Sequence, residues 1–375
     1  MLLKFRFKNY KSFAEDAILD MTATSNKEHI YTIIHSNGKK ILPVAGLFGA
    51  NGSGKSNFFD AFQTMCTEVL NTSNKYQSVT PSAFDTNMKK TPTEFEVSIT
   101  IEDKKYIYGF SKHRKEIVEE WLFEQEVHSK EKCIFYTEKN TMHFKSCPKS
   151  EKEELCSAFD TLPKEKLLLT ALGEREKSSY SKVYVWFRRT ATYQYGSDSL
   201  ALQMLEVLPK VKNDVLNLLQ ELDSSIVDLE VKQQGKKSYK VYFHHLNEKG
   251  DKVRIPLKNE AQGIQKMLSL AVWIILSQST SLVLFVDDLD THLHPLILRY
   301  ILNLYINPDK NKNQSQLIFS SHNLNFSDLR KDEIWFVEKE NQKSTMFSLS
   351  DFKTENNTDY EKHYLCGRYG AIPFI

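Results

Sequence analysis

The chain has 375 residues, of which 41% are apolar and 26% are charged, so it can bury a sizeable core and does not have the composition of a disordered protein. Fifty basic and 48 acidic side chains leave a net charge of +2. This balance excludes a protein-wide basic surface for nucleic acid or an anionic membrane, although a local basic patch remains compatible with it. The five cysteines form no C-x-x-C pair, which argues against a disulfide framework and a zinc ribbon and favours a reduced, cytoplasmic location.

In the first half of the chain the apolar pattern predicts mostly strands. Alternation of apolar and polar residues predicts strands at 3–7 and 18–21. A short apolar run at 42–48 predicts a strand that is buried on both faces of a sheet. Helical spacing follows from 58 to 70, after a glycine-rich turn. Alternation returns between about 94 and 145, which indicates a meander of antiparallel strands.

From about 150 the pattern changes to leucines at helical spacing among Glu and Lys, which predicts a helical insertion as far as residue 222. Its apolar stripe is interpreted as core packing, and no heptad runs long enough for a coiled-coil arm. The last third then alternates between strands and helices. The expected elements are strands at 226–231 and 239–243, helix 260–276, strand 282–287, helix 295–305 and strands at 316–320 and 333–338.

One uncharged stretch, Met267–Val286, is long enough to span a bilayer. A polar segment, Ser277–Ser281, interrupts it, and an aspartate pair follows it at once. A buried helix, a turn and a buried strand therefore fit this stretch better than a membrane span. The N-terminus alternates like a strand and has no long apolar core, so no signal peptide is expected.

The strongest motif is G-A-N-G-S-G-K-S at 49–56, a full match to G-x-x-x-x-G-K-[ST] between a predicted strand and a predicted helix. Glycines let successive backbone N–H groups face one anion, and the following helix adds its positive N-terminal end. Lys55 is expected to reach the β- and γ-phosphates, and the Ser56 hydroxyl to bind Mg²⁺. The predicted nucleotide-contacting residues here are Gly49, Asn51, Gly52, Ser53, Gly54, Lys55, Ser56 and Asn57.

A second motif is the apolar run at 282–286, which ends in Asp287 and Asp288. A strand that ends in an acid can deliver a carboxylate to the Mg²⁺ beside a phosphate loop, and Asp287 is predicted to hold that ion. Asp288 occupies the place where a glutamate usually orients the attacking water, and it is one methylene shorter. In isolation, an Asp-Asp pair is more simply interpreted as a strand-end turn.

A third motif is the apolar strand at 316–320, which is followed by His322. An imidazole at the end of such a strand can sense the γ-phosphate, so His322 is predicted to act together with Asp288 in catalysis. His292, His294 and the pair His244 and His245 have no third ligand at a plausible spacing and are interpreted as structural.

The order of these motifs excludes a compact GTPase, since no N-K-x-D motif exists, and the spacing is unlike that of a transport cassette. The arrangement resembles the ABC-type ATPase head of structural-maintenance and recombination proteins, in which these motifs are called Walker A, Walker B and the switch histidine. The resemblance implies that N-Y-K-S-F at 9–13 reaches the nucleotide through Lys11. It also implies that N-E-A-Q-G-I-Q-K at 259–266 is the signature motif, whose Gly263 contacts the nucleotide of a second copy, and that 289–295 is the D-loop.

The C-terminal part of the chain is similar to one branch of that class, the RloA/AbiL-type abortive-infection ATPases. The similarity lies in D-E-I-W-F-V-E-K at 332–339, S-L-S-D-F at 348–352 and Y-L-C-G-R-Y-G-A-I-P at 364–373. This last block is expected to support the head or to dock a partner, without a catalytic role. The chain departs from the family pattern twice, because Ala261 replaces the signature serine and Asp288 replaces a glutamate. Both departures favour slow hydrolysis or a nucleotide-held sensor.

The fold class expected from these patterns is α/β, a P-loop ABC-type ATPase head with an antiparallel β meander and a helical insertion subdomain. The expected ranges are 1–75 for the N-terminal part of the head, 76–149 for the meander, 150–222 for the helical insertion and 223–375 for the C-terminal part of the head. The resemblance implies an ATP- and Mg²⁺-dependent, slowly hydrolysing sensor or regulator of a phage-defence system.

The implied partners are one or more further copies of the chain, which form a homodimer or a higher homo-oligomer through the heads, and a separately encoded effector that is nuclease-like or a toxin, with no membrane partner. Two alternatives remain open: a DNA-associated ATPase of the recombination and repair type, and a nucleotide-locked scaffold without turnover. The net charge gives no indication of a nucleic-acid partner.

Overall fold

The computed structural model describes residues 1–71, 78–83, 88–127, 129–139, 141–144, 147, 149–173, 178–193, 199–235, 239–322, 326–354 and 358–373. The chain divides into two compact units, Met1–Thr190 with Leu324–Ile375 (unit 1) and Ala191–Asn323 (unit 2). The boundary after Thr190 falls inside the range 150–222, for which the sequence predicts a helical insertion. The domain ranges therefore stay a prediction.

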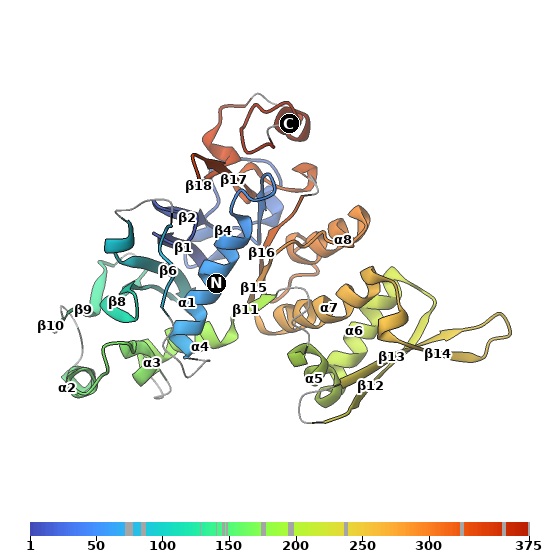
Figure 1. Ribbon diagram of the computed structural model, residues 1–375, viewed down its shortest axis with the longest axis horizontal. Coiled ribbons are helices and arrows are strands. Elements are labelled where there is room, and N and C mark those ends of the chain that lie inside the picture. The colour runs from blue at the N-terminus through green and yellow to red at the C-terminus, as the bar shows by residue number, and fades with distance from the viewer. Residues whose placement is uncertain are drawn as a thin grey trace. The chain divides into compact units, whose positions relative to one another are not determined.

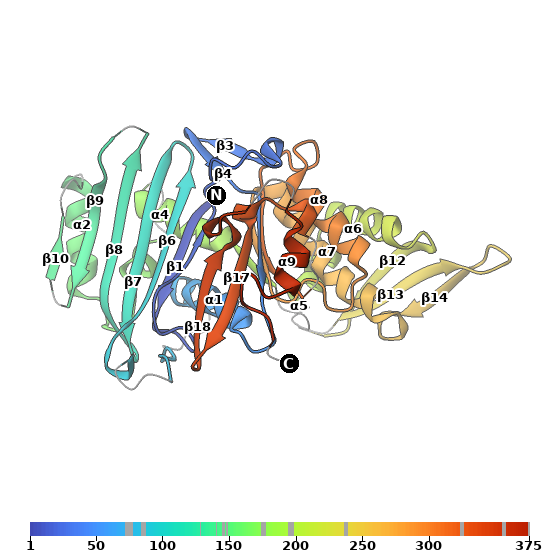
Figure 2. The same ribbon diagram turned by 90° about the horizontal axis from the view of Figure 1, so that it is seen from above.

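Unit 1 contains a seven-stranded antiparallel sheet in the order β10-β9-β8-β7-β6-β1-β2, which Figure 2 shows nearly face-on. Its long central strands bury alternate side chains such as Phe95, Val97 and Ile99, as expected for a sheet with one covered face. The strands are β1 (Leu2–Lys8), β2 (Ala17–Asp20), β6 (Thr93–Ile101), β7 (Lys104–His113), β8 (Glu116–Glu126), β9 (Lys132–Glu138) and β10 (Thr141–His143).

Helices cover one face of this sheet. Phe5 of β1 makes edge contacts with Phe58 and Phe62 of α1 (Lys55–Leu70), and Tyr108 of β7 meets Phe187 of α4 (Ser179–Arg189) in the same way. Aromatic pairs of this geometry add to the stabilisation that burial already provides. The sheet therefore fixes α1, the helix that follows the phosphate loop.

A buried carboxylate attaches a further short helix, α3 (Leu168–Leu172), to the meander. Glu120 of β8 accepts hydrogen bonds from the backbone N–H groups of Leu168 (2.6 Å) and Leu169 (2.9 Å) and from the hydroxyl of Tyr108 (2.9 Å). Burial raises the pKa of Glu120 to about 7 in spite of these three donors. Helix α2 (Lys149–Asp160) precedes α3 along the chain.

The phosphate loop follows a second, separate group of strands in unit 1. Strand β5 (Val44–Phe48) is buried along its whole length and pairs in parallel with β17 (Ile334–Glu340). Strand β17 in turn pairs in antiparallel fashion with β18 (Lys343–Ser348). The remaining elements of unit 1 are the hairpin β3 (Ile34–Ser36) and β4 (Lys39–Ile41) and helix α9 (Tyr360–Leu365).

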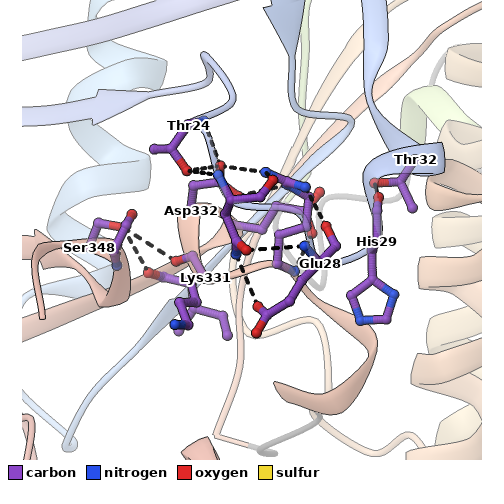
Figure 3. A network of polar contacts seen from close by, with 12 residues as sticks. Thr24, Glu28, His29, Thr32, Lys331, Asp332 and Ser348 are labelled. Atoms are coloured by element: carbon purple, nitrogen blue, oxygen red, sulfur yellow. Dashed lines mark hydrogen bonds and ion pairs between the residues drawn. The ribbon is translucent and has the colours of Figure 1, made fainter. Parts of the chain in front are cut away.

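A network of polar contacts joins the segment that contains Thr24 and Glu28 to Asp332, just before β17 (Figure 3). A buried arginine, Arg330, takes part in it. Arg330 is fully buried and donates from Nε and Nη2 to the two carboxylate oxygens of Asp332, both at 2.9 Å. Its remaining donors reach the carbonyl oxygens of Glu28 and Asn26. Asp332 also accepts from the N–H (2.7 Å) and the hydroxyl (2.8 Å) of Thr24. We call this set of contacts the Arg330 clamp.

In unit 2, strands β11 (Ala191–Tyr193), β15 (Val283–Val286) and β16 (Gln316–Ser320) pair in parallel. A separate antiparallel sheet contains β12 (Ile226–Gln233), β13 (Tyr239–Leu246) and β14 (Lys252–Pro256) (Figure 1). The helices are α5 (Ser199–Val207), α6 (Pro209–Leu222), α7 (Gln262–Thr280) and α8 (Pro295–Ile306).

The predicted fold class is confirmed: the chain is α/β, with a phosphate loop between a buried strand and a helix, an antiparallel meander and a run of helices after it. The uncharged stretch from Met267 forms most of α7, a turn with Ser281 at φ 57°, and strand β15, so the expected helix, turn and strand are present. The turn is shorter than the polar segment Ser277–Ser281 predicts, because α7 continues to Thr280. Among the residues that the structure describes, none of the helices combines the length and the apolarity that crossing a bilayer requires.

Candidate functional site

The loop at 49–54 is curled by glycines at positions where another residue does not fit. Gly49 has φ 153°, and a Cβ there would lie 2.2 Å from the carbonyl oxygen of Val337 on β17. Gly54 has φ 120°, and a Cβ there would lie 2.5 Å from the hydroxyl oxygen of Ser344 on β18. The loop is therefore packed against β17 and β18 so closely that only glycine is accommodated at these two positions.

Lys55 lies beneath the loop at the first position of α1. Its side chain is buried, and its Nζ donates to the carbonyl oxygens of Gly49 (2.8 Å) and Ala50 (3.2 Å). These bonds hold both carbonyls towards the ammonium group of Lys55. The N–H groups of Ala50 and Ser53 donate to the carbonyl oxygens of Ala371 and Ala50. A cation inside a curl of backbone amides is an arrangement suited to an anion such as phosphate.

The predicted nucleotide-contacting residues of the loop differ in exposure. Asn51, Gly52 and Ser56 are exposed, whereas Ser53 is buried. The hydroxyl of Ser53 has no hydrogen-bond partner among the described residues, which is costly for a buried polar atom. A hydroxyl without a partner in a glycine-rich loop agrees with a loop that binds a ligand, because the ligand would supply the missing hydrogen bond.

A chain of polar contacts joins the start of α1 to Ser12 and to β18. Asn57 donates from Nδ2 to the hydroxyl of Ser12 at 2.7 Å. The hydroxyl of Ser344 lies 2.7 Å from that of Ser12 and 2.5 Å from the carbonyl oxygen of Ser53. Asn57, a predicted nucleotide contact, is thus joined to the N-terminal turn at 9–13. The sequence did not single out Ser344, because no local pattern indicates that β18 reaches the loop.

Lys11 lies in that N-terminal turn, with a left-handed backbone at φ 49°. Its Nζ forms an ion pair of 2.6 Å with Asp60 of α1, and about a third of each side chain is exposed. Asp60 also accepts a hydrogen bond from the hydroxyl of Tyr10. The turn is therefore attached to α1 beside the phosphate loop, and the nucleotide contact of Lys11 stays a prediction.

In unit 2, the two aspartates that follow β15 share one serine. Ser320, the last residue of β16, donates from its hydroxyl to Oδ1 of Asp287 at 2.6 Å and accepts from the N–H of Asp288 at 2.7 Å. Asp288 has a left-handed backbone at φ 49°, a conformation that Asp and Asn tolerate better than most residues. The arrangement orients the carboxylate of Asp287 and turns the chain sharply at Asp288.

His322 lies close to the same turn. Its Nε2 is 3.7 Å from Oδ1 of Asp288, and nearly half of each side chain is exposed. Its backbone N–H donates to Asp290 of the predicted D-loop at 3.0 Å. The structure therefore brings together Asp287, Asp288 and His322, the three predicted residues of unit 2 at the ends of β15 and β16.

The predicted signature motif forms the start of α7. Oε1 of Glu260 lies 2.9 Å from Nε2 of His245 on β13, in agreement with the structural role assigned to that histidine. Gly263 faces the backbone of the predicted D-loop, since a Cβ on it would lie 3.0 Å from the carbonyl oxygen of His292. Lys266, which the sequence did not single out, is fully buried and donates from Nζ to the carbonyl oxygens of Asp288 (2.6 Å) and Leu289 (3.0 Å).

A cavity of about 360 Å³ adjoins the phosphate loop in unit 1. It is lined by residues 50–53 of the loop, 337–339 of β17 and 371–373 of the C-terminal segment. The carbonyl oxygen of Ala371 accepts a hydrogen bond of 3.0 Å from the N–H of Ala50. The C-terminal block is therefore in direct contact with the loop.

A protein-family profile described as "AAA domain, putative AbiEii toxin, Type IV TA system" matches residues 44–139 and 152–328, well over half of the chain. The chain belongs to this family. Membership in this AAA-domain family agrees with the predicted P-loop ATPase. The RloA/AbiL-type branch stays a prediction. No curated protein matches the sequence.

Among solved structures, the chain is similar to an SMC head domain from Thermotoga maritima, with 14% identity, a TM-score of 0.44, and coverage of 92% of this chain and 98% of that one. It is also similar to an Smc head domain with an extended coiled coil, bound to the C-terminal domain of ScpA, from Pyrococcus furiosus, with 12% identity, a TM-score of 0.42 and coverage of 92% and 96%. A third similar structure is the recombination mediator protein RecF with ATP, with 14% identity, a TM-score of 0.36 and coverage of 92% and 97%.

Proposed function

We propose that this AAA-domain protein binds ATP with Mg²⁺ at the loop at 49–56 and hydrolyses it slowly. The observation that carries this proposal is the geometry of the loop, in which buried Lys55 holds the carbonyls of Gly49 and Ala50 inward beneath a glycine curl. Family membership supports the same assignment. In this proposal Lys55 neutralises the phosphates, and the exposed residues Asn51, Gly52 and Ser56 face the nucleotide.

The oxygen donors for Mg²⁺ in this proposal are the hydroxyl of Ser56 and the carboxylate of Asp287. Among the described residues no group of three or more His, Cys, Asp or Glu side chains could hold a metal by itself. One carboxylate and one hydroxyl suit Mg²⁺, because proteins usually bind this ion through few side chains and leave nucleotide phosphates and water to complete its coordination. When bound, the ion would neutralise charge that develops on the phosphates.

Asp288 and His322 are the residues proposed to act on the γ-phosphate, with Asp288 orienting the attacking water. Two features support slow turnover. Asp288 is one methylene shorter than the usual glutamate, and its backbone is already committed to a left-handed turn. Ala261, which precedes α7, offers no hydroxyl to a nucleotide bound by a second copy. Gly263 is proposed to contact the nucleotide of that second copy, in a dimer of heads.

At the level of biology, we propose a sensor or regulator of an anti-phage, abortive-infection system that acts on a separately encoded effector. The family description, which names a putative AbiEii toxin and a type IV TA system, supports the defence context. The separately encoded effector is implied by the sequence resemblance alone. Co-purification of the product of a neighbouring gene, in the presence and absence of ATP, tests this role. Binding to DNA that weakens steeply with salt would instead favour the repair-type alternative.

Isothermal titration with ATP and Mg²⁺ tests the central proposal. The wild-type protein is expected to bind, and Lys55→Ala is expected to show no measurable binding, because the variant removes the side-chain cation of the loop. Ser56→Ala is expected to weaken binding mainly when Mg²⁺ is present. Thermal unfolding without nucleotide shows that each variant is folded. Near wild-type affinity in a folded Lys55→Ala variant would overturn the site assignment.

A phosphate-release assay at saturating ATP separates the proposed ATPase from a nucleotide-locked scaffold. We expect slow but measurable release that Lys55→Ala abolishes. Binding without any release above the Lys55→Ala background would favour the scaffold alternative.

A further inference from the structure

The peptide group between Gly49 and Ala50 is held at both of its ends. Its carbonyl oxygen accepts a hydrogen bond of 2.8 Å from Nζ of Lys55, and its N–H donates one of 3.0 Å to the carbonyl oxygen of Ala371. Because a peptide group is planar, a contact that orients the N–H also orients the carbonyl. The C-terminal segment therefore helps to set the orientation of an acceptor that positions Lys55.

The carbonyl of Ala371 is itself positioned by a tyrosine. The hydroxyl of Tyr364, on α9, donates to this carbonyl at 2.9 Å, so one oxygen accepts from both Tyr364 and Ala50. Burial raises the pKa of Tyr364 to about 12, so its hydroxyl keeps its proton at neutral pH. The side chain of Tyr364 is only 6% exposed, which excludes bulk water as a competing partner.

Strand β17 holds this segment beside the loop. Ala371 has a left-handed backbone at φ 57°, and its N–H donates to Oε1 of Glu338 at 2.9 Å. A Cβ on Gly370, which has φ 70°, would lie 2.8 Å from the same oxygen. Two consecutive residues are thus turned sharply around Glu338, and this turn presents the Ala371 carbonyl to the loop.

Aromatic packing provides the base for this turn, where α9 lies beside β17 (Figure 2). The ring of Phe336 on β17 stacks with that of Tyr364 (centroids 5.1 Å apart, 6° between planes) and with that of Tyr369 (5.7 Å, 19°). Both tyrosines are buried, but their hydroxyls have different partners. The hydroxyl of Tyr369 lies 3.3 Å from Nδ1 of His363, and among the hydrogen bonds of the described residues none joins it to Ala371.

We propose that Tyr364 is a positioning residue for the phosphate loop: through the carbonyl of Ala371 it fixes the Gly49–Ala50 peptide and thereby the acceptor of Lys55. Docking of the segment 364–371 and binding of ATP are therefore coupled, and each strengthens the other. This inference rests on the proposed function, because it concerns the affinity of the same loop for nucleotide. It does not assign a catalytic role to the C-terminal block.

The two tyrosines on Phe336 provide a matched pair of variants. Tyr364→Phe removes the hydroxyl that positions Ala371 and keeps the stacked ring, whereas Tyr369→Phe removes a hydroxyl that does not reach the loop. Titration with ATP and Mg²⁺ is expected to show affinity about 2- to 10-fold weaker for Tyr364→Phe, the range that corresponds to one hydrogen bond. Tyr369→Phe is expected to bind as the wild type does. The melting temperatures of the two nucleotide-free variants should be similar.

Hydrogen exchange followed by mass spectrometry reports on the coupling directly. In nucleotide-free protein, amides of residues 49–55 are expected to exchange faster in Tyr364→Phe than in Tyr369→Phe. In the wild type, ATP is expected to slow exchange at residues 364–371, and this protection should be smaller in Tyr364→Phe.

The outcomes distinguish the inference from the function on which it rests. Equal ATP affinities for both variants, beside a wild type that binds, would overturn the inference and leave the proposed function intact. A wild type that binds no ATP would overturn the proposed function. In that case, equal exchange at residues 49–55 in the two nucleotide-free variants would also overturn the positioning role.

Discussion

The buried ammonium group of Lys266 on α7 lies 2.6 Å from the carbonyl oxygen of Asp288, to which it donates a hydrogen bond. It donates a second bond of 3.0 Å to the carbonyl of Leu289, so one side chain joins the predicted signature helix to the turn after β15. Burial lowers the pKa of Lys266 to about 8, against the opposing influence of Asp290, Asp288 and Asp287. The backbone on which Asp288 depends is thus fixed from within unit 2.

Replacing Lys266 by Met keeps the aliphatic length and removes both hydrogen bonds. We expect Lys266→Met to lower the free energy of unfolding by about 1–3 kcal/mol, since buried carbonyls lose their donor. We also expect phosphate release to fall by more than ATP affinity does, because the turn carrying Asp288 loosens while the phosphate loop is unchanged. Urea unfolding and phosphate release measure the two effects. The exposed Lys258→Met is the control, and equal results for both lysines would contradict this role.

Two substitutions at Asp288 test whether its carboxylate orients the attacking water. Asp288→Glu should extend the carboxylate towards the attacking water and raise phosphate release, since positioning groups contribute about 10²–10⁴-fold to such rates. The same change should lower stability by about 1–2 kcal/mol, because glutamate is poorly suited to φ 49°. Asp288→Asn should keep the turn and ATP binding, lower turnover further and accumulate an ATP-bound dimer on gel filtration.

The neighbouring aspartate provides the contrast for these variants. Asp287→Asn should weaken Mg²⁺-dependent ATP affinity, because this carboxylate is proposed to serve the metal and not the water. Rates at saturating ATP for wild type, Asp288→Glu and Asp288→Asn decide the role of Asp288. Three equal rates would show that Asp288 only forms the strand-end turn.

Substitutions at Gly52 and Gly54 distinguish two reasons why the phosphate loop needs glycine, backbone strain and steric overlap. Gly52 has φ 76°, and a Cβ on it would meet no atom of the described residues within 4 Å, whereas a Cβ on Gly54 would meet Ser344 at 2.5 Å. Gly52→Ala should therefore cost about 1–2 kcal/mol of unfolding free energy, and Gly54→Ala about 1–3 kcal/mol more. Urea unfolding measures both values.

A double variant then identifies the overlap as the cause. Ser344→Gly removes the nearest atoms that a Cβ on Gly54 would meet and leaves the Ser12 hydroxyl at 3.0 Å. The pair Gly54→Ala and Ser344→Gly should therefore be less unstable than the sum of the two single variants. Strict additivity would show that overlap with Ser344 does not contribute to the need for glycine at position 54.

The buried carboxyl group of Glu333 is expected to make the stability of the protein depend on pH. Burial raises its pKa to about 8 from an ordinary value of 4.5, and Asp332 adds to this effect. Between these two pH values the folded protein keeps a proton that the unfolded chain has released. Stability should therefore fall as the pH rises from about 4.5 to 8, by at most about 1.4 kcal/mol per pH unit from this group, and it should level off above pH 8.

Glu333→Gln removes this titration and resembles the protonated side chain. Urea unfolding between pH 5 and 9, at intervals of about one unit, should show a shallower decline for the variant than for the wild type. The exposed Glu340→Gln is the control. A variant with the same slope as the wild type would show that other buried groups, such as Glu120, cause the dependence.

The sequence predicts those parts of the site in which neighbouring residues of the chain supply both the local structure and the chemical groups. The loop at 49–56 requires glycine for its curl and lysine for its charge, and both requirements are visible in eight consecutive residues. Strands β5, β15 and β16 are short apolar runs because both of their faces are buried, and this made their ends, and hence Asp287 and His322, identifiable. The helices and strands in these regions lie within a few residues of their predicted bounds.

The parts that the sequence does not predict depend on tertiary contacts between distant segments. Ser344 lies outside every motif, and the motifs that contain Ala371 and Ser320 do not indicate which contacts these two residues make. Only the pairing of β17 with β18 and the docking of α9 bring Ser344 and Ala371 to the loop. Strands β11 and β14 were missed because they are short or largely exposed, so their apolar pattern is weak. Lys266 was part of a predicted motif, but its burial against two carbonyls is invisible in sequence.

The Arg330 clamp imposes an order on folding. The guanidinium bonds to the carbonyl of Asn26 across 304 positions, so the segment containing Thr24 and Glu28 cannot make these contacts until residue 330 has been synthesised. At roughly 5–20 residues per second, a ribosome needs about 15–60 s to cover that interval. Closing so long a stretch of chain makes this contact a late and slow event. The segment that contains Thr24 and Glu28 is synthesised early but is therefore among the last parts of unit 1 to reach its native conformation.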